Sequence, residues 1–234
     1  IIANNVFNHS DKPLDFLRGV YNLLKENAIF TFEQPNFTVG VLSLKFDQIY
    51  HEHVSYFTAR NIKSILDYSN LKILSLSKNE YHGGSLRTVA AKKNSSLKEF
   101  KIDKFINYEN KKNIYKLGFY KKMIKKINYK KKFLLSTLIN LSKKGYVISG
   151  VGAGAKSNTF LTFYGLNYKI IKFLTDSSIF KKNKYTPVSR IIIKDDKELI
   201  KYKKIACIIL SWNISNLVID KIKKLNKRIK IIYT

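Results

Sequence analysis

Residues 146–160 read YVISGVGAGAKSNTF, and they decide the fold of this part of the chain because an apolar run leads directly into glycines. Gly150, Gly152 and Ala155 fit the G-x-G-x-x-A pattern that joins a strand to a helix in dinucleotide-binding domains. Glycine at these positions lets backbone amides and a helix N-terminus approach a phosphate. Asp176 ends the next apolar run at roughly the distance of a ribose-binding acid. The stretch predicts a nucleotide-binding α/β layer, and the alternative is a tight turn that only closes the fold.

The last 90 residues continue the same pattern. After Asp176 come the apolar runs SRIII and KIACIILSW, then the helical stretch NISNLVIDKIKKLN and the final run IKIIYT. Strand-like and helical patterns that alternate in this way favour a parallel sheet with helices on its faces. We therefore expect residues 145–234 to form a small Rossmann-like α/β domain.

The first 92 residues also alternate between strand-like and helical patterns. Proline lacks the donor that a strand needs, so it ends one, whereas it suits the first turn of a helix. A threonine side chain can cap a helix, and paired glycines suit a turn. The expected elements are a strand at 1–5, a helix from Pro13, a strand at 28–35, a helix after Thr58, and two strands joined by a turn at Gly83 and Gly84. This order predicts a doubly wound α/β sheet that ends in an antiparallel hairpin.

Residues 93–144 separate these two regions. The polar stretch from 93 to about 113, which includes KKNSSLKEFK, is predicted to be a linker. A long basic helix is expected at about 114–144, because apolar residues recur along one face. They are Leu117, Tyr120, Ile124, Ile127, Leu134, Leu138 and Leu141. Its lysines are interpreted as a solvated face, and a helix lying on a membrane surface is the alternative.

Composition restricts the partners. The formal net charge is +28, yet only Arg18, Arg60, Arg87, Arg190 and Arg228 are arginine among 44 basic residues. Nucleic-acid readers favour the bidentate guanidinium, so we expect no nucleic-acid partner. No apolar run is long enough to span a bilayer, and Cys207 is the only cysteine, so we expect a cytoplasmic protein with no membrane partner. Because the chain opens on the strand-like IIANNV without methionine, it is interpreted as a fragment.

Residues 46–57 read FDQIYHEHVSYF and hold two of the four histidines. His51 and His53 would lie on the same face of a strand, which is a spacing of metal ligands. No neighbouring residues supply further ligands at a recognisable spacing, so we expect no metal site here. Glu52 offers a carboxylate that could orient the imidazole of His53 for acid and base chemistry. A structural histidine pair is the alternative interpretation.

Six motifs of this chain together resemble those of one enzyme family, and they occur in the same order from residue 1 to about 215. They are NNVFNHSDKPLDFLRGVYNLL, FEQP, FDQIYHEHVSYF, HGGSLR, GVGAGAKSNTFLTFYG and LSWN. The chain resembles the S-adenosylmethionine-dependent C-methyltransferases of nucleotide-linked keto-deoxysugars, which include enzymes that place a branch methyl on C-3. The resemblance implies base-catalysed enolate formation followed by methyl transfer.

The resemblance also implies an architecture of three parts. A small zinc-binding N-terminal domain precedes a class I methyltransferase domain, and a C-terminal α/β domain helps to hold the nucleotide-sugar. This chain would supply the C-terminal half of the methyltransferase domain at 1–92 and the C-terminal domain at 145–234. The glycine-rich loop and acid that grip most of the cofactor would lie outside it, as would the zinc, and the chain alone would be inactive.

The site residues follow from the same resemblance. His53 resembles the base, and Glu52, Tyr50 and His9 line the sugar pocket beside the methyl donor, with Tyr50 or His9 donating to the enolate oxygen. Asn4 and Asn5 are expected to contact the methionine part of S-adenosylmethionine. Candidates for binding the nucleotide-sugar are His82, Arg87, Gly152, Lys156 and Asn158, and for His82 and Arg87 a structural role in the hairpin is an equal alternative.

One motif supports a second function. The fingerprint from Gly150 to Asp176, taken alone, indicates NAD(P) rather than a nucleotide-sugar. An NAD(P)-dependent oxidoreductase or a nucleotide-binding module is therefore the alternative to the methyltransferase.

Overall fold

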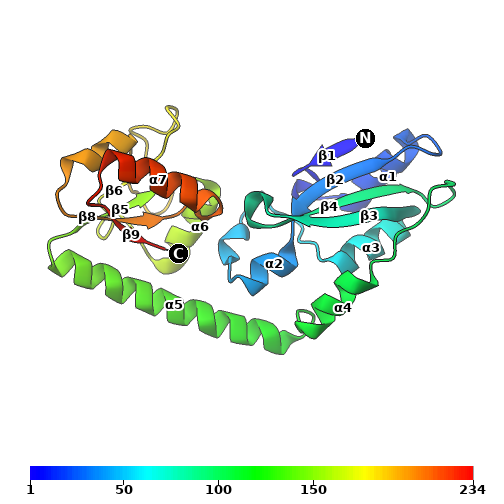
Figure 1. Ribbon diagram of the computed structural model, residues 1–234, viewed down its shortest axis with the longest axis horizontal. Helices are drawn as coiled ribbons and strands as arrows, with labels where there is room; N and C mark the ends of the chain where they lie inside the picture. Colours follow the sequence, from blue (N-terminus) through cyan, green and yellow to red (C-terminus); the bar gives the residue numbers. More distant parts are fainter. Residues whose placement is uncertain (234) are drawn as a thin grey trace. The chain divides into compact units, whose positions relative to one another are not determined.

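The computed structural model describes residues 1–233, except for the side chain of His82 (Figure 1). The chain divides into two compact units whose bounds differ from the expected domains. Unit 1 comprises Ile1–Lys45 and His51–Ile124, and unit 2 comprises Phe46–Tyr50 and Lys125–Thr234. The short segment Phe46–Tyr50 thus packs with residues that follow it by more than 70 positions.

Unit 1 is built on a mixed sheet of four strands in the order β1-β2-β4-β3. The strands are β1 (Ile2–Asn4), β2 (Phe30–Pro35), β3 (Leu71–Asn79) and β4 (Ser85–Lys92). β1 runs parallel to β2, whereas β4 runs antiparallel to both of its neighbours. The hairpin expected around Gly83 is confirmed, since Leu71 pairs with Lys92 and Ser77 with Arg87.

Two of the four helices of unit 1 begin where the sequence predicts a helix start. The four are α1 (Pro13–Leu23), α2 (Phe37–Leu42), α3 (Ala59–Tyr68) and α4 (Asp103–Lys111). Pro13 occupies the first turn of α1, and the Thr58 side chain accepts a hydrogen bond from the Asn61 amide at the start of α3. α2 was not expected, because its sequence FTVGVL is rich in β-branched residues and glycine, which are weak helix formers.

The linker prediction for residues 93–113 is wrong, because this stretch contains α4. The Glu109 carboxylate of α4 is buried and accepts hydrogen bonds from the Thr38 hydroxyl at 2.9 Å and from the Ala59 amide at 2.8 Å. Ile102 is also buried in the core of unit 1, with Phe105 and Ile106 packed against it. The Glu109 carboxylate thus accepts a hydrogen bond from a backbone amide that the N-terminus of α3 would otherwise leave without a partner. This contact helps to hold α4 in place, although the sequence of α4 shows little apolar periodicity.

Unit 2 contains a five-stranded parallel sheet in the order β7-β6-β5-β8-β9. Its strands are β5 (Val147–Val151), β6 (Phe173–Thr175), β7 (Ile193–Lys194), β8 (Ile205–Ile209) and β9 (Lys230–Ile232). From β5 the chain adds β6 and β7 on one side of the strand, and it then returns to add β8 and β9 on the other side. The order in which strands are added therefore reverses between β5 and β8. In an open parallel sheet, the carboxyl end at such a point is where ligands bind.

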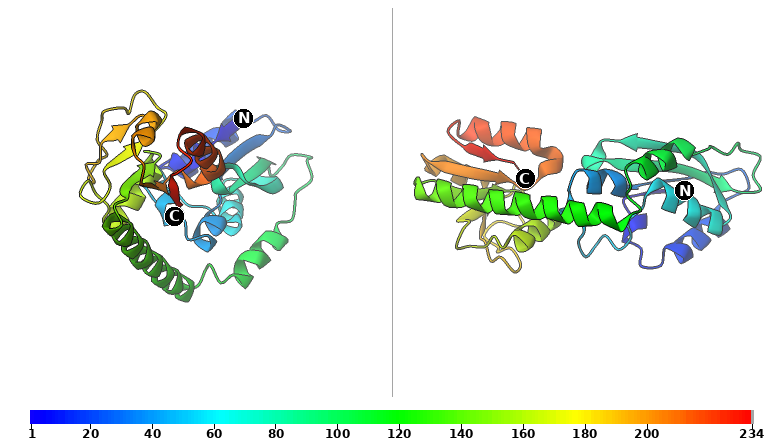
Figure 2. Two further views of the ribbon diagram at one scale, coloured as in Figure 1. Left: turned by 60° about the vertical axis from the view of Figure 1, so that its left-hand side comes forward. Right: turned by 90° about the horizontal axis from the view of Figure 1, so that it is seen from below.

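Helices cover both faces of this sheet, as Figure 2 shows. α5 (Leu117–Lys143) and α6 (Ala155–Tyr164) pack on the face that carries Ile148, and α7 (Ser215–Leu225) packs on the opposite face, which carries Val151. The expected α/β fold of both regions is thus confirmed. The apolar face expected along α5 is confirmed only in part, because Leu117 and Ile124 are exposed. Within residues 1–233, no helix is long and apolar enough to cross a membrane.

Candidate active site

The structure brings two of the predicted catalytic histidines together in unit 1. The ring of His9 meets the ring of His53 edge to face, with 5.2 Å between the ring centroids. His53 is only 8% exposed, whereas His9 is exposed to solvent. The amides of Val54 and Ser55 both donate to the carbonyl oxygen of Asn8, at 3.0 and 3.1 Å. These two hydrogen bonds hold the segment after His53 against the segment that contains His9.

Residues 50–56 form a turn and an irregular segment rather than a strand. A regular strand would point Glu52 and His53 to opposite faces, so a bend is the conformation that an active-site role for both requires. Glu52 nevertheless lies at the surface, where its Oε1 is 3.9 Å from Nε2 of His51. Its predicted role in orienting His53 stays a prediction. The predicted role of Tyr50 also stays a prediction, and the contacts of Tyr50 place it in unit 2.

Sequence reasoning missed Asn8 and Tyr56 as neighbours of the histidine pair. The Asn8 side chain is 2% exposed, and neither its Oδ1 nor its Nδ2 has a hydrogen-bond partner within residues 1–233. The Tyr56 ring lies edge to face with His53, at 6.5 Å between centroids. Buried polar groups are nearly always hydrogen-bonded, so the unpartnered amide of Asn8 suggests a ligand or water beside His9. Its position next to His9 in NNVFNH is the signal that could have found it.

Asn4 ends β1 and Asn5 follows it, at the place where the methionine part of the donor was expected. The Asn5 amide donates to the Glu33 carbonyl oxygen at 2.7 Å, and its φ of 53° turns the chain out of the strand. The side chain of Asn4 is exposed at this carboxyl end. In residues 1–92, however, glycine occurs only at 19, 40, 83 and 84, so no glycine-rich loop directly follows β1. Residues 1–92 thus offer polar side chains but no such loop at the end of β1, and the contact with the methionine part of S-adenosylmethionine stays a prediction.

Arg87 lies on β4, and its Nε donates to Oε2 of Glu33 on the neighbouring strand at 2.9 Å. The Glu33 side chain is 5% exposed, so Arg87 neutralises a buried carboxylate. This contact favours the structural interpretation of Arg87. The side chain of His82 lies outside the described residues, and its role stays a prediction.

The glycines of the fingerprint are required by close packing at the carboxyl end of β5. A Cβ on Gly150 would lie 2.7 Å from Cδ2 of Leu174. A Cβ on Gly152 would lie 1.9 Å from Oγ of Ser211, and the φ of Gly152 is 97°. A Cβ at either position would force a neighbouring side chain to shift, and at Gly152 it would also strain the backbone, so both glycines have reasons internal to the fold.

Asp176, the expected ribose acid, binds its own loop. It accepts hydrogen bonds from the Ala153 amide at 2.8 Å, the Ser178 amide at 2.9 Å and the Lys181 ammonium at 3.1 Å. Burial alone would raise the pKa of Asp176, but these three donors together hold that pKa below its usual value. The structure thus gives the fingerprint acid a structural role, which weakens the NAD(P) alternative.

This arrangement predicts a dependence of stability on pH. Because the pKa of Asp176 is lower in the folded protein, its carboxylate stabilises the fold above the unfolded pKa of about 4. That contribution is lost as the pH falls through the lower, folded pKa. We expect Asp176→Asn to lower the free energy of unfolding by about 2 kcal/mol at pH 7.

The measurement is urea unfolding between pH 3 and 7, with fluorescence of Trp212 as the probe because it is the only tryptophan. The difference between wild type and Asp176→Asn should shrink below about pH 4. Asp220→Asn, at an exposed position of α7, is the matched control and should show no such change. A constant difference across the whole range would contradict the assignment.

A cavity of about 290 Å³ lies at the carboxyl end of the sheet in unit 2, where its direction changes. Its polar lining includes Gly152, Asp176, Asp196, Ser211 and Lys221. Lys221 forms an ion pair with Asp196 at 2.7 Å, so the charges of this cavity are largely matched. Of the predicted substrate-binding residues, only Gly152 is among its described lining residues.

Lys156 and Asn158 lie in the first turns of α6. The ammonium of Lys156 is 5.2 Å from the centre of the Trp212 ring. Burial lowers the pKa of Lys156, and the nearby Asp47 carboxylate acts in the opposite direction. Oδ1 of Asn158 is buried and has no hydrogen-bond partner in the described part of the chain. Their predicted contact with the nucleotide-sugar stays a prediction.

Asp47 and Trp212 form the contact in unit 2 that sequence reasoning did not foresee. Asp47 is 3% exposed, and its Oδ2 accepts a hydrogen bond from Nε1 of Trp212 at 2.5 Å. Asp47 lies in the motif FDQIYHEH and Trp212 in the motif LSWN. The sequence thus marked both stretches, but it did not indicate that they are in contact.

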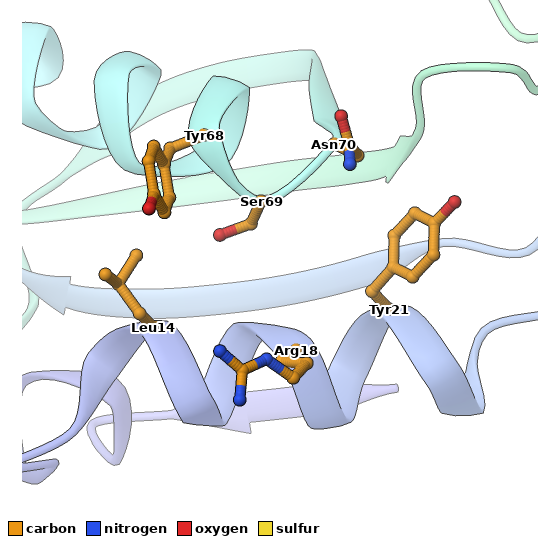
Figure 3. Close-up of a pocket in the computed structure, with 6 residues that line it drawn as sticks. All are labelled: Leu14, Arg18, Tyr21, Tyr68, Ser69 and Asn70. Carbon is orange, nitrogen blue, oxygen red and sulfur yellow. The ribbon is translucent and has the colours of Figure 1, made fainter.

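Two surface grooves of unit 1 contain none of the predicted site residues. One groove, with a volume of about 200 Å³, is lined by Leu14, Arg18, Tyr21, Tyr68, Ser69 and Asn70. Figure 3 shows these residues on α1 and at the end of α3. The other shares Leu14 and Tyr68 and extends to Tyr56. No group of three or more potential metal-ligating side chains occurs in the region that the structure describes.

Two family models match the chain. Residues 80–233 match the family described as C-methyltransferase C-terminal domain, and residues 1–76 match the family described as Methyltransferase domain. C-methyltransferase NovU of Streptomyces niveus is 24% identical over 225 residues, which are 96% of this chain and 54% of that protein. The chain thus spans about half the length of the curated relative that it matches.

Proposed function

Because this chain belongs to the S-adenosylmethionine-dependent C-methyltransferase family, we propose that it contributes the base and the sugar pocket to C-methylation of a nucleotide-linked keto-deoxysugar. The observation that supports this best is the pair of His9 and His53, which are 44 positions apart and meet at 5.2 Å between ring centroids. The sugar substrate rests on the motifs that resemble the nucleotide-sugar enzymes.

His53 is the proposed general base. A proton on the carbon next to a ketone must be removed before that carbon can attack a methyl group, and an imidazole near neutral pH can accept it. His53 is largely buried, so little water competes for the proton at its ring nitrogen. The carbon–hydrogen electron pair moves into the enolate, and the carbonyl oxygen becomes an oxyanion.

The oxyanion needs hydrogen-bond donors. His9 is beside the base, and its ring is exposed and able to donate when protonated. The amide of Asn8 is a second donor with no partner in residues 1–233, and Tyr50 is a third candidate from the sequence. Asn4 and Asn5 would contact the methionine part of bound S-adenosylmethionine, which supplies the methyl group as an electrophile.

The test follows both halves of the reaction in the longest natural form of the protein. It is incubated with nucleotide-linked keto-deoxysugars in deuterated water, and deuterium uptake at the carbon next to the ketone is measured with and without S-adenosylmethionine. We expect uptake without the donor and a new carbon–methyl bond with it. Matched sugars with the ketone reduced to a hydroxyl are the control and should do neither. Equal methylation of the reduced sugars would contradict the proposal, because they cannot form an enolate.

A further inference from the structure

The cavity of about 290 Å³ at the carboxyl end of the parallel sheet lies wholly within unit 2. Residues at the ends of β5 and β6 and in the turn after β8 line it, and α7 forms one side. None of the residues proposed to act in methyl transfer is among them. A cavity at the point where the strand order reverses is the usual ligand site of such a sheet. The chemistry of the lining indicates which ligand fits.

Two buried oxygen atoms of the lining have no hydrogen-bond partner within residues 1–233. Thr175 is fully buried, and its Oγ1 is one of them. Its side chain lies on the face of the sheet that carries Val151 and Phe173, which is the face that α7 covers. The other is Oδ1 of Asp196, whose Oδ2 forms the ion pair with Lys221. Because buried polar atoms are nearly always satisfied, both oxygens indicate a bound group in the cavity.

The charges of the lining disfavour a phosphate. Asp176 also lines the cavity, but both of its carboxylate oxygens already accept hydrogen bonds from its own loop. Lys221 is the only cation among the described lining residues, and it is paired with Asp196. A phosphate would therefore meet two carboxylates and no unpaired cation, which is unfavourable. A neutral ligand that donates hydrogen bonds fits better.

Asp196 and Thr175 together suit a vicinal diol. A carboxylate oxygen only accepts hydrogen bonds, so its partner must be a donor, whereas a threonine hydroxyl can donate or accept. Of two neighbouring hydroxyl groups on a ribose, one donates to Oδ1 of Asp196 and the other pairs with Oγ1 of Thr175. An acid that binds a ribose diol is common in domains of this architecture. Here Asp196 has an oxygen free for that role, and Asp176 has none.

Apolar side chains stand beside these polar groups. They are Ile214, Leu217, Val218 and Ile222, and the first two are also exposed to solvent. Exposed apolar side chains at the edge of a cavity mark a place where a ligand ring can pack. A nucleobase provides such a ring, and a free monosaccharide does not. A volume of about 290 Å³ is at the small end of ligand sites, which suits one nucleoside rather than a dinucleotide.

We propose that this cavity binds a ribonucleoside, with the ribose diol held by Asp196 and Thr175 and the base packed against Ile214 and Leu217. The inference goes beyond the proposed function, because it concerns binding in unit 2 and no step of methyl transfer.

The test measures binding of uridine and cytidine to the longest natural form of the protein, with S-adenosylhomocysteine present to fill the methyl-donor site. The NMR signals of the Leu217 and Val218 methyl groups report on the cavity. We expect saturable shifts with a Kd in the millimolar range or tighter. 2′-Deoxyuridine should bind about tenfold more weakly, because it leaves one oxygen without a partner. Methyl β-ribofuranoside has the diol but no base, and it should bind more weakly by a similar factor.

Two variants test the polar contacts. Thr175→Val keeps the shape of the side chain and removes its hydroxyl, so we expect uridine to bind about tenfold more weakly. The same variant should raise the urea midpoint of the free protein, since it removes a buried oxygen that has no partner. Asp196→Asn keeps the size of the side chain and removes its charge, and it should weaken binding at least as much. Asp220→Asn, at an exposed position of α7, is the matched control and should bind like the wild type.

The proposal is overturned if neither nucleoside shifts the Leu217 and Val218 signals, or if Thr175→Val and Asp196→Asn bind uridine as tightly as the wild type. Binding of 2′-deoxyuridine or of methyl β-ribofuranoside with the affinity of uridine would also overturn it, because the diol or the base would then contribute nothing. Since every readout is binding or unfolding without turnover, failure of the proposed methyl transfer would leave these outcomes unchanged.

Discussion

Substitution of His53 by alanine is expected to lower kcat for methyl transfer by roughly 10² or more, which is the usual scale for losing a general base. Affinity for S-adenosylmethionine should change little, because the proposed base would contact the sugar and not the methyl donor. The loss should appear equally in deuterium uptake at the carbon next to the ketone, since both depend on the same proton transfer. Turnover with a labelled methyl donor and calorimetric titration of the donor check the two halves of this expectation.

His51→Ala is the matched control for this experiment. His51 is two residues from His53 in the same turn, but its side chain is 83% exposed and faces Glu52. We expect it to keep nearly full activity. Equal activity of His53→Ala and His51→Ala would return the histidine pair to a structural role.

Substitution of Gly152 by alanine is expected to lower the free energy of unfolding by about 3 kcal/mol or more. The added Cβ would lie 1.9 Å from Oγ of Ser211, and a φ of 97° is unfavourable for any residue with a side chain. Urea unfolding followed by circular dichroism measures the change.

Gly154→Ala is the matched control two positions away. No heavy atom lies within 4 Å of its added Cβ, and its φ of −93° suits alanine, so we expect a change within about 1 kcal/mol. The double variant Gly152→Ala with Ser211→Gly removes the contact but keeps the strained φ, and it should recover part of the loss. A Gly152→Ala protein as stable as Gly154→Ala would show that the close approach to Ser211 is not needed.

The sequence by itself determined the two sheets and most of their helices, but not α2 and α4, because these features depend on local patterns. The run from 146 to 160 predicted β5 and α6, and Thr58 predicted the start of α3. Glycines 83 and 84 predicted the hairpin of β3 and β4. Each of these signals acts within a few residues, through backbone preference, capping or the period of apolar side chains. The histidine motif likewise marked a candidate site, but not its geometry.

Only the tertiary structure decided which distant groups meet. The Asp47–Trp212 hydrogen bond joins residues 165 positions apart, and Glu109 caps the start of α3 from 50 positions away. Neither contact leaves a periodic trace in the sequence, and around Glu109 the abundance of lysine hides the short apolar pattern of α4. The partners of Asp176 and Arg87 were found in the same way, because a carboxylate or guanidinium that looks available for a ligand gains its partner within the protein only once the chain has folded. Burial makes such pairing obligatory, and burial is set by the whole fold rather than by neighbouring residues.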